Sequence, residues 1–251
     1  MAARFAQRSV LVTGSTNGIG RATALAFAAE GAHVLVTGRD GERGQKVVAA
    51  IEEAGGRADF IAADMAAGEP EVTRLAQWAT ELAGGPVDVL VNNAAYLVGG
   101  APTADTTDEV IDLALTVSVK APFLLTKALA PAMAARGSGA IVNVGSINGL
   151  VGMKGSALYG ATKSALHSLT KSWAAEFGPS GVRVNTVAPG PTTTERNEAI
   201  RDRLDQLVAG TPSGRTSTTA EVAAAILFLA GDDAANIHGA TLAVDGGFTT
   251  H

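Results

Sequence analysis

Hydrophobic residues in this chain gather in short runs rich in valine, leucine and isoleucine, and these runs alternate with longer alanine-rich stretches. Most of the runs are continuously apolar, which is typical of strands that are buried on both faces of a parallel sheet. The pattern therefore predicts strands at 9–13, 33–37, 58–62, 87–92, 140–144, 182–187 and 241–244.

The alanine-rich stretches are long enough to form helices that cross over the sheet in the right-handed sense. They predict helices at about 18–30, 41–54, 70–83, 106–135, 156–177 and 219–230. No linker, repeat or low-complexity segment interrupts this alternation. We therefore expect the α/β fold class, with a single domain over 1–251 built as a Rossmann-type, doubly wound parallel sheet of seven strands with helices on both faces.

One stretch, 190–217, departs from the alternation, because it combines glycines and prolines with a polar helical segment. Ligands of doubly wound sheets bind beyond the carboxyl ends of the strands. Long irregular segments at that edge commonly act as lids. We therefore predict that 190–217 is a substrate flap.

Composition narrows the range of partners. The formal net charge is -5 and no block of lysine or arginine is present, so we expect neither nucleic acid nor an anionic membrane surface as a partner. The chain has no cysteine and only four scattered histidines, which argues against a metal site. No uninterrupted apolar run approaches the roughly 18 residues of a membrane helix, and no signal peptide is evident. We expect a cytoplasmic protein.

A glycine-rich segment, TGSTNGIG, follows the first predicted strand and leads into the first predicted helix. The first glycine permits a tight turn, the second lets the backbone approach a diphosphate, and the third brings helix and strand together. The helix N-terminus also attracts negative charge. We interpret the segment as a dinucleotide-binding turn, although an ordinary strand-to-helix turn is the alternative. Its residues are Gly14, Ser15, Thr16, Asn17, Gly18, Ile19 and Gly20.

The end of the second predicted strand decides which dinucleotide fits, because a carboxylate there would hold the adenine-ribose diol and repel a 2′-phosphate. Position 38 is a glycine and Arg39 follows it. Arg39 can pair with a 2′-phosphate through charge-assisted hydrogen bonds, so NADP(H) is favoured over NAD(H). The alternative is that Arg39 is a solvated charge beside Asp40.

Two further segments are candidates for cofactor contacts. Asp64 and Met65 follow the third strand, where a carboxylate can accept a hydrogen bond from the adenine amine; Asp64 as a helix cap is the alternative. Asn92 and Ala94 follow the fourth strand, where the backbone must pass close to the cofactor. Turn-forming asparagine is the alternative there.

Tyr159 and Lys163 lie four positions apart on a predicted helix, so both project from one face. A tyrosine has a pKa of about 10, and a cation beside its hydroxyl favours the phenolate. Ser146, just past the fifth strand, can donate a hydrogen bond to a carbonyl or alkoxide oxygen. These residues indicate a proton exchange at Tyr159 with Ser146 polarising the oxygen. Taken alone, however, such a pair is usually a solvated helix face.

The order of the motifs resembles that of the short-chain dehydrogenase/reductase family across essentially the whole chain. The matching segments are TGSTNGIG, Asp64, NNAA, Ser146, YGATK, APGPTTTE and VDGG.

The resemblance implies that the glycine-rich turn binds the cofactor diphosphate and that Ser146, Tyr159 and Lys163 are catalytic. It implies that Lys163 and Tyr159 also contact the cofactor and that Thr194 contacts the nicotinamide carboxamide. We place Pro189, Gly190 and Thr192 of the same segment at the cofactor. The family further implies a homotetramer, or a homodimer, and structural roles for Asp88 and Asn185.

Two positions depart from the family's pattern. The family has an asparagine in its long fourth helix that bends the helix and holds a water linking the lysine to solvent, and here that position is Ser118. Ser118 either retains this catalytic relay role through its hydroxyl or is a neutral helix residue. Ala95 stands where glycine is common, which costs about 1 kcal/mol if the position needs a positive φ.

The expected pocket wall is mostly apolar and shows no fixed cation. It comprises Tyr96, Leu97 and Val98, then Asn148, Leu150, Val151 and Met153, and the flap. We therefore expect an NADP(H)-dependent oxidoreductase that interconverts a ketone and a secondary alcohol, on a small molecule with a hydrophobic body. A 3-oxoacyl-carrier-protein reductase, a non-catalytic dinucleotide-binding sensor, and a lyase or epimerase that retains its cofactor are the alternatives.

Overall fold

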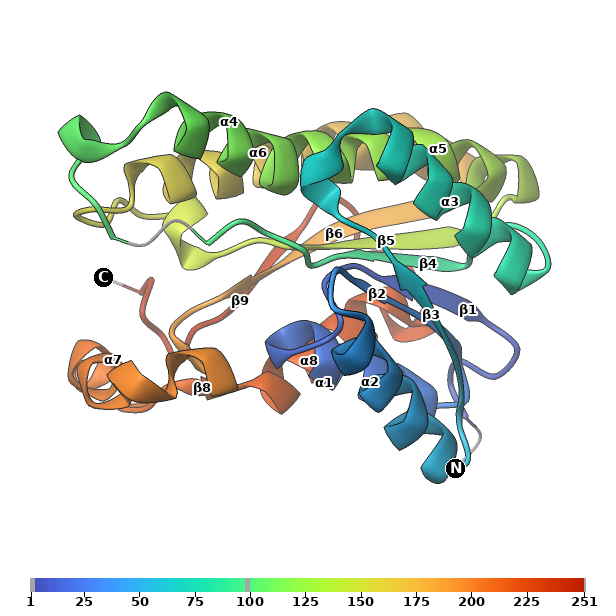
Figure 1. Cartoon of the computed structure of the whole chain (residues 1–251), viewed down its shortest axis with the longest axis horizontal. Coiled ribbons are helices and arrows are strands. Elements are labelled where there is room, and N and C mark those ends of the chain that lie inside the picture. The colour runs from blue at the N-terminus through green and yellow to red at the C-terminus, as the bar shows by residue number, and fades with distance from the viewer. Residues whose placement is uncertain (1–2, 98–99, 251) are drawn as a thin grey trace.

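The chain folds into a seven-stranded sheet with helices packed on both of its faces (Figure 1). The computed structural model describes residues 3–97 and 100–250. Every strand pairs in parallel with its neighbour, in the order β3-β2-β1-β4-β5-β6-β9. The seven strands are β1 (Ser9–Val12), β2 (His33–Gly38), β3 (Arg57–Ala62), β4 (Val89–Asn92), β5 (Gly139–Val144), β6 (Val182–Pro189) and β9 (Thr241–Val244).

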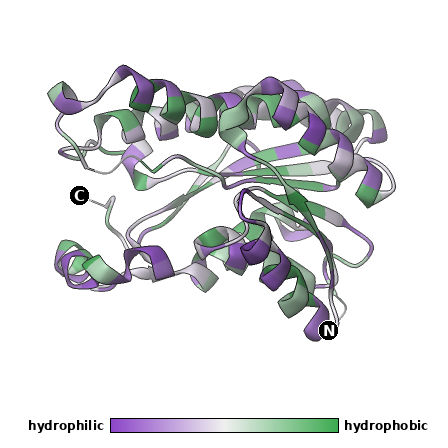
Figure 2. Cartoon of the chain, viewed as in Figure 1, coloured by the Kyte–Doolittle hydropathy of each residue, from purple (hydrophilic) through white to green (hydrophobic). Residues whose placement is uncertain are grey.

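Two hydrophobic cores, one on each face, hold the layers together. Helices α1 (Gly18–Ala29), α2 (Gly41–Glu53) and α8 (Thr219–Ala230) cover one face, where Val12, Val36 and Val91 are fully buried. The other face is covered by α3 (Glu69–Ala83), α4 (Asp108–Leu115), α5 (Ala121–Arg136) and α6 (Ala157–Phe177). Figure 2 shows hydrophobic residues concentrated along the strands between these layers. Burial on both faces explains why the strand segments are continuously apolar.

The predicted fold class is confirmed, and the predicted strands and helices match the observed ones to within a few residues. The helix predicted at 106–135 differs in one respect. It is interrupted between α4 and α5 by a turn of π-helix at Thr116–Lys120, which contains Ser118. Such turns inside α-helices are frequent at functional sites.

The stretch predicted as a flap contains two short strands and a helix. β7 (Thr192–Thr193) pairs in parallel with β8 (Ser217–Thr218), and α7 (Arg201–Val208) lies between them. The pairing ties the two ends of the stretch together beyond the carboxyl end of β6. In Figure 1 the stretch projects to one side of the sheet, below the end of β9.

The helical stretch Asp108–Arg136 is long and apolar enough to cross a membrane, judged by length and composition alone. This stretch contains no long uninterrupted apolar run, because polar residues are interspersed along it. Core helices pass the same test. Here Leu125, Leu129 and Met133 are buried in the core, which accounts for part of the apolar composition.

Asn185 holds the end of the sheet together. Its Nδ2 donates to the carbonyl of Ile237 (2.7 Å), and its Oδ1 accepts from the N–H of Ala240 (2.9 Å), just before β9. The side chain is buried and fully paired. Asn185 thus couples β6, which leads into the flap, to the last strand.

Replacement of Asn185 by alanine leaves two backbone groups without partners. We expect the free energy of unfolding to fall by about 2 to 3 kcal/mol, because each unpaired buried group carries a desolvation cost. Urea denaturation measures the change. Asn236→Ala, at an exposed position nearby, is the matched control and should change the stability by less than about 0.5 kcal/mol. Equal stabilities of the two variants would contradict the bracing role.

Candidate active site

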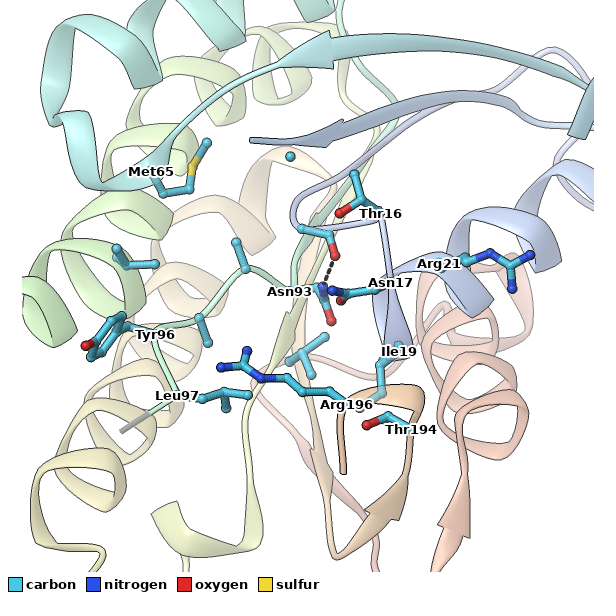
Figure 3. Close-up of a pocket in the computed structure, with 18 of the residues that line it drawn as sticks. Thr16, Asn17, Ile19, Arg21, Met65, Asn93, Tyr96, Leu97, Thr194 and Arg196 are labelled. Atoms are coloured by element: carbon cyan, nitrogen blue, oxygen red, sulfur yellow. Dashed lines mark hydrogen bonds between the residues drawn. The ribbon is translucent and has the colours of Figure 1, made fainter. Parts of the chain in front are cut away.

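A cavity of about 1060 Å³ opens at the carboxyl edge of the sheet (Figure 3). Its lining residues come from the turn after β1, the ends of β2 to β6, helix α6 and the flap. The sheet order reverses between β1 and β4, and a doubly wound sheet opens a crevice at that point. Within 3–97 and 100–250, no group of three or more histidine, aspartate or glutamate side chains is placed to hold a metal ion.

The glycine-rich turn forms one wall of the cavity. Gly14 and Gly18 both have positive φ, 63° and 51°, which side-chain-bearing residues rarely adopt. A Cβ on Gly14 would lie 3.1 Å from the Cα of Ala94, and a Cβ on Gly20 would collide with the carbonyl oxygen of Gly14. Helix α1 begins at Gly18, so its N-terminus faces the same space. This bare backbone cradle fits a dinucleotide diphosphate.

Most of the residues that the sequence predicts for the site line the cavity together. Ser15 and Asn92 do not. The Ser15 hydroxyl is buried and donates to the carbonyl of Val12 (2.7 Å), and Asn92 donates to Asn143 Oδ1 (2.9 Å). Both side chains stabilise the strand ends beneath the cavity. The lining residues among those predicted are Gly14, Thr16, Asn17, Gly18, Ile19, Gly20, Arg39, Asp64, Met65, Ala94, Ser146, Tyr159, Lys163, Pro189, Gly190, Thr192 and Thr194.

Asn93 lines the cavity at the position where we predict Asn92 from the sequence. Its Nδ2 donates to the carbonyls of Thr13 (2.8 Å) and Gly14 (3.1 Å), so it anchors the glycine-rich turn (Figure 3). The alternation of side chains along β4 sends Asn92 toward the core and leaves Asn93 at the cavity. The sequence offers two adjacent asparagines, and only the register of the strand distinguishes them.

Asp64 lies at the cavity and also caps a short 3-10 turn, through a hydrogen bond from the N–H of Ala66 to its Oδ1 (3.0 Å). The two interpretations of Asp64 are therefore compatible. Met65, in the same turn, extends its side chain toward the cavity in Figure 3.

The end of β2 has no room for a carboxylate. A Cβ on Gly38 would lie 2.7 Å from Thr16 Cγ2. Arg39 lines the cavity, and among the described residues it makes no ion pair. Two further cations, Arg43 and Lys46, line this end of the cavity, each near a partner carboxylate on α2 or at its N-cap.

Ser146, Tyr159 and Lys163 line the other end of the same cavity. Tyr159 and Lys163 are one turn apart on α6, as the sequence predicts. The Lys163 Nζ lies 5.6 Å from the centre of the Tyr159 ring and donates to the carbonyl of Val144 (2.7 Å). That carbonyl is at the end of β5, two residues before Ser146. The contact therefore fixes α6 against the strand that positions the serine.

Burial controls the ionisation of both catalytic candidates on α6. It lowers the pKa of Lys163 to about 8. Burial raises the pKa of Tyr159, and a hydrogen bond with Ser146 acts in the opposite direction. The sequence predicts instead that a neighbouring cation favours the phenolate. The difference arises because the ammonium is bonded to Val144 and the phenol is largely removed from water, so Tyr159 holds its proton.

His167 is a buried neighbour of the site that the sequence did not single out. Its Nε2 accepts the N–H of Ser146 (3.4 Å), and its Nδ1 has no partner among the described residues. Burial, together with the charges of Lys163 and Lys171, lowers the pKa of His167 to about 4. The histidine is therefore neutral at physiological pH. The sequence signal that could have identified His167 is its position four residues after Lys163, one helical turn away.

Ser118 is buried, at 1 % exposure, and does not line the cavity. Its hydroxyl accepts the N–H of Tyr96 (3.0 Å), which ties the π-helical turn to the segment after β4. The structure shows no direct hydrogen bond from Ser118 to Lys163 among the described residues. A relay role for Ser118 stays a prediction. Ala95 does not have a positive φ, so alanine carries no strain there.

The observed wall near the catalytic residues differs from the predicted one. Tyr96 and Leu97 line the cavity, joined by Leu113 of α4 and Val117 of the π-helical turn. Val98 lies outside the described residues. The four residues predicted from the segment after β5 do not line the cavity; they are Asn148, Leu150, Val151 and Met153.

The flap closes the remaining side. Thr194 lies next to the glycine-rich turn, where a Cβ on Gly18 would be 3.6 Å from Thr194 Cγ2. Arg196 also lines the cavity, so the flap adds an exposed cation to a wall in which the sequence predicts no fixed cation. The sequence does not reveal this because Arg196 stands in a polar segment where charged residues are expected to face solvent.

Comparison with known proteins agrees with this geometry. Residues 14–249 match the family described as Enoyl-(Acyl carrier protein) reductase. The chain is 38% identical to the cyclopentanol dehydrogenase of Comamonas sp. over 99% of each chain. It is 38% identical to the cis-4-hydroxycyclohexanecarboxylate dehydrogenase of Sinomonas cyclohexanicum, again over 99% of each.

A solved structure is similar over its whole length. The crystal structure of a protein from Beutenbergia cavernae with NADP bound at low occupancy superposes with a TM-score of 0.92 at 37% identity and covers 100% of both chains. The fold, the glycine-rich turn, the catalytic trio and these matches agree. The chain belongs to the short-chain dehydrogenase/reductase family.

Proposed function

We propose that this protein is an NADP(H)-dependent oxidoreductase that interconverts a ketone and a secondary alcohol. The observation that carries the proposal is the convergence of Ser146, Tyr159 and Lys163 on the cavity that the glycine-rich turn also lines. Proton-exchanging groups and a diphosphate cradle in one space match a reaction in which a bound cofactor exchanges hydride with the substrate. The protein's own side chains carry out the proton transfer.

Each catalytic side chain has a distinct role in the reduction of a ketone. The Ser146 hydroxyl donates a hydrogen bond to the carbonyl oxygen and stabilises the negative charge that develops there. Tyr159, which holds its proton because burial raises its pKa, gives that proton to the same oxygen. Lys163, anchored by Val144, holds positive charge near the tyrosine as the phenolate forms. In the oxidation of an alcohol, Tyr159 takes the proton back.

The preference for NADP(H) is supported by the end of β2. Gly38 leaves no carboxylate to repel a 2′-phosphate, and Thr16 fills the space that a side chain there would need. The Arg39 guanidinium lines the same end of the cavity. Arg43, half a turn into α2, adds positive charge. A guanidinium binds phosphate through two parallel hydrogen bonds, which suits a terminal 2′-phosphate.

A substrate with a hydrophobic body is supported by the wall around the catalytic residues. Leu97, Leu113 and Val117 give an apolar lining, and Tyr96 adds an aromatic surface. Two relatives bear the names of dehydrogenases of ring alcohols. We therefore place the substrate among alicyclic ketones and secondary alcohols.

Tyr159→Phe removes only the hydroxyl that exchanges the proton. We expect kcat for ketone reduction to fall by at least about 100-fold, as for loss of general acid catalysis. NADPH binding, measured by fluorescence titration, should persist. Tyr96→Phe is the matched control, because Tyr96 lines the same cavity, and it should retain activity within a few-fold. Near-normal turnover in Tyr159→Phe would refute the proton-transfer role.

Arg39→Asp replaces the proposed phosphate partner by a carboxylate. We expect the ratio of kcat/KM for NADPH to that for NADH to fall by about 10- to 100-fold, because a charge-assisted hydrogen bond is lost and repulsion is added. Steady-state kinetics with both cofactors measure the ratio. Arg57→Asp, an exposed charge reversal on β3 away from the cavity, is the control. If both variants shift the ratio equally, Arg39 does not bind the 2′-phosphate.

Ser118→Asn restores the residue that the family usually has in the π-helical turn. An asparagine can still accept the N–H of Tyr96 and adds a donor that can hold a water near Lys163. We expect turnover to rise severalfold and its pH profile to move. Ser118→Ala, which leaves the Tyr96 N–H without its partner, should lower both stability and turnover. A rate and pH profile that Ser118→Asn leaves unchanged, in a variant of normal stability, would show that serine at this position does not slow the reaction.

A further inference from the structure

Apart from the buried Lys163, the positive side chains that line the cavity come from two places. Arg21, Arg39, Arg43 and Lys46 come from α1, the end of β2 and α2, which surround the nucleotide end. Arg196 is the one exposed cation of the described lining that comes from the flap. Arg196 is not needed to neutralise a 2′-phosphate, because the cations at the nucleotide end can do so. It calls for a separate explanation.

The orientation of Arg196 is visible in Figure 3. Its side chain extends from the flap across the cavity in the direction of Leu97, whereas Arg21 lies on α1 at the opposite side. Leu97 belongs to the apolar wall near the catalytic residues. The guanidinium therefore stands in the part of the cavity where the substrate's body is expected.

The backbone that presents Arg196 is held firmly. Asn197 Oδ1 accepts the N–H of Thr194 (2.8 Å), and Asn197 Nδ2 donates to the carbonyl of Thr192 (2.7 Å). The hydroxyls of Thr193 and Thr216 share a further hydrogen bond (2.8 Å), and β7 pairs with β8. Although the arginine side chain is exposed, its point of attachment is fixed, which makes its charge a defined feature of the cavity.

Among the residues that the structure describes, the ion pairs of the flap leave Arg196 uncompensated. Arg201 pairs with Glu198, and Arg215 pairs with Glu221. Glu195 also lines the cavity, but no ion pair joins it to Arg196. An arginine with open donors that reaches toward the apolar side chain of Leu97 matches a carboxylate, which accepts two parallel hydrogen bonds from a guanidinium.

We propose that Arg196 is a specificity-determining residue that binds a carboxylate on the substrate, so that the substrate class is oxo and hydroxy acids built on an alicyclic ring. The proposal rests on the proposed function and adds the anionic group to it. The cofactor diphosphate is the other anion near the cavity. It is served by the glycine-rich turn and the N-terminus of α1, while Arg196 reaches toward Leu97.

Binding of a substrate-like carboxylate tests the proposal without turnover. Calorimetry measures the affinity of cyclohexanecarboxylate, and of the neutral cyclohexanecarboxamide, for the protein saturated with NADPH. We expect the wild type to prefer the carboxylate and Arg196→Gln to lose about tenfold or more of that affinity, with the amide unaffected. Arg203→Gln, an exposed arginine on the flap outside the cavity, is the matched control and should behave as the wild type.

Three results would overturn the proposal. The first is that the wild type shows no preference for the carboxylate. The second is that Arg196→Gln and Arg203→Gln weaken carboxylate binding equally. The third is that Arg196→Gln weakens NADPH binding and leaves carboxylate binding unaffected, which would assign the arginine to the cofactor diphosphate.

Kinetics separate this proposal from the proposed function. With 4-oxocyclohexanecarboxylate and its methyl ester as substrates, Arg196→Gln should raise KM for the acid about tenfold or more, and leave kcat and the ester nearly unchanged. An equal loss on acid and ester would contradict a carboxylate site. Reduction of neither ketone by the wild type would contradict the proposed function, whereas the calorimetric preference for the carboxylate would still decide the role of Arg196.

Discussion

The active site depends on the hydrogen bond between the buried ammonium of Lys163 and the carbonyl of Val144. Removing an ammonium from water costs several kcal/mol, and this contact offsets part of that cost. The residual cost lowers the pKa of Lys163 to about 8. The contact also fixes α6 against the end of β5, which sets Tyr159 relative to Ser146. A lysine that is costly to bury thus aligns the two groups that we propose to act on the substrate's oxygen.

The scaffold brings this trio to the cofactor by topology. The sheet order reverses between β1 and β4, so the glycine-rich turn after β1 and the proposed catalytic residues after β5 and on α6 share one cavity. Asn93 reinforces the junction, because it binds the backbone of the turn from the end of β4. The residues proposed for proton transfer and those proposed for cofactor binding are therefore adjacent in space, although they are far apart in the sequence.

The sequence predicted much of this because burial on both faces leaves continuous apolar runs, and because Tyr159 and Lys163 share a helical period. It predicted less where different structures leave similar patterns of apolar and polar residues. A π-helical turn has nearly the same spacing of apolar residues as an α-helix, so the break at Ser118 was not detected. The pairing of β7 with β8 spans two residues on each strand, too few for a pattern. Arg196 and His167 were missed because a lone charge in a polar segment, or a lone histidine on a helix, has no distinctive neighbours in sequence.

Transfer of deuterium measures most directly whether this cavity exchanges hydride between a nicotinamide cofactor and a carbonyl carbon. NADPH in which deuterium replaces both hydrogens at C4 of the nicotinamide is mixed with the protein and cyclopentanone, and the alcohol is analysed by mass spectrometry. The arrangement of Ser146, Tyr159 and Lys163 predicts that the label appears on the carbinol carbon, while the hydroxyl proton comes from Tyr159 and hence from solvent. Alcohol formed without the label, or with solvent deuterium on that carbon when the reaction runs in heavy water, would contradict it.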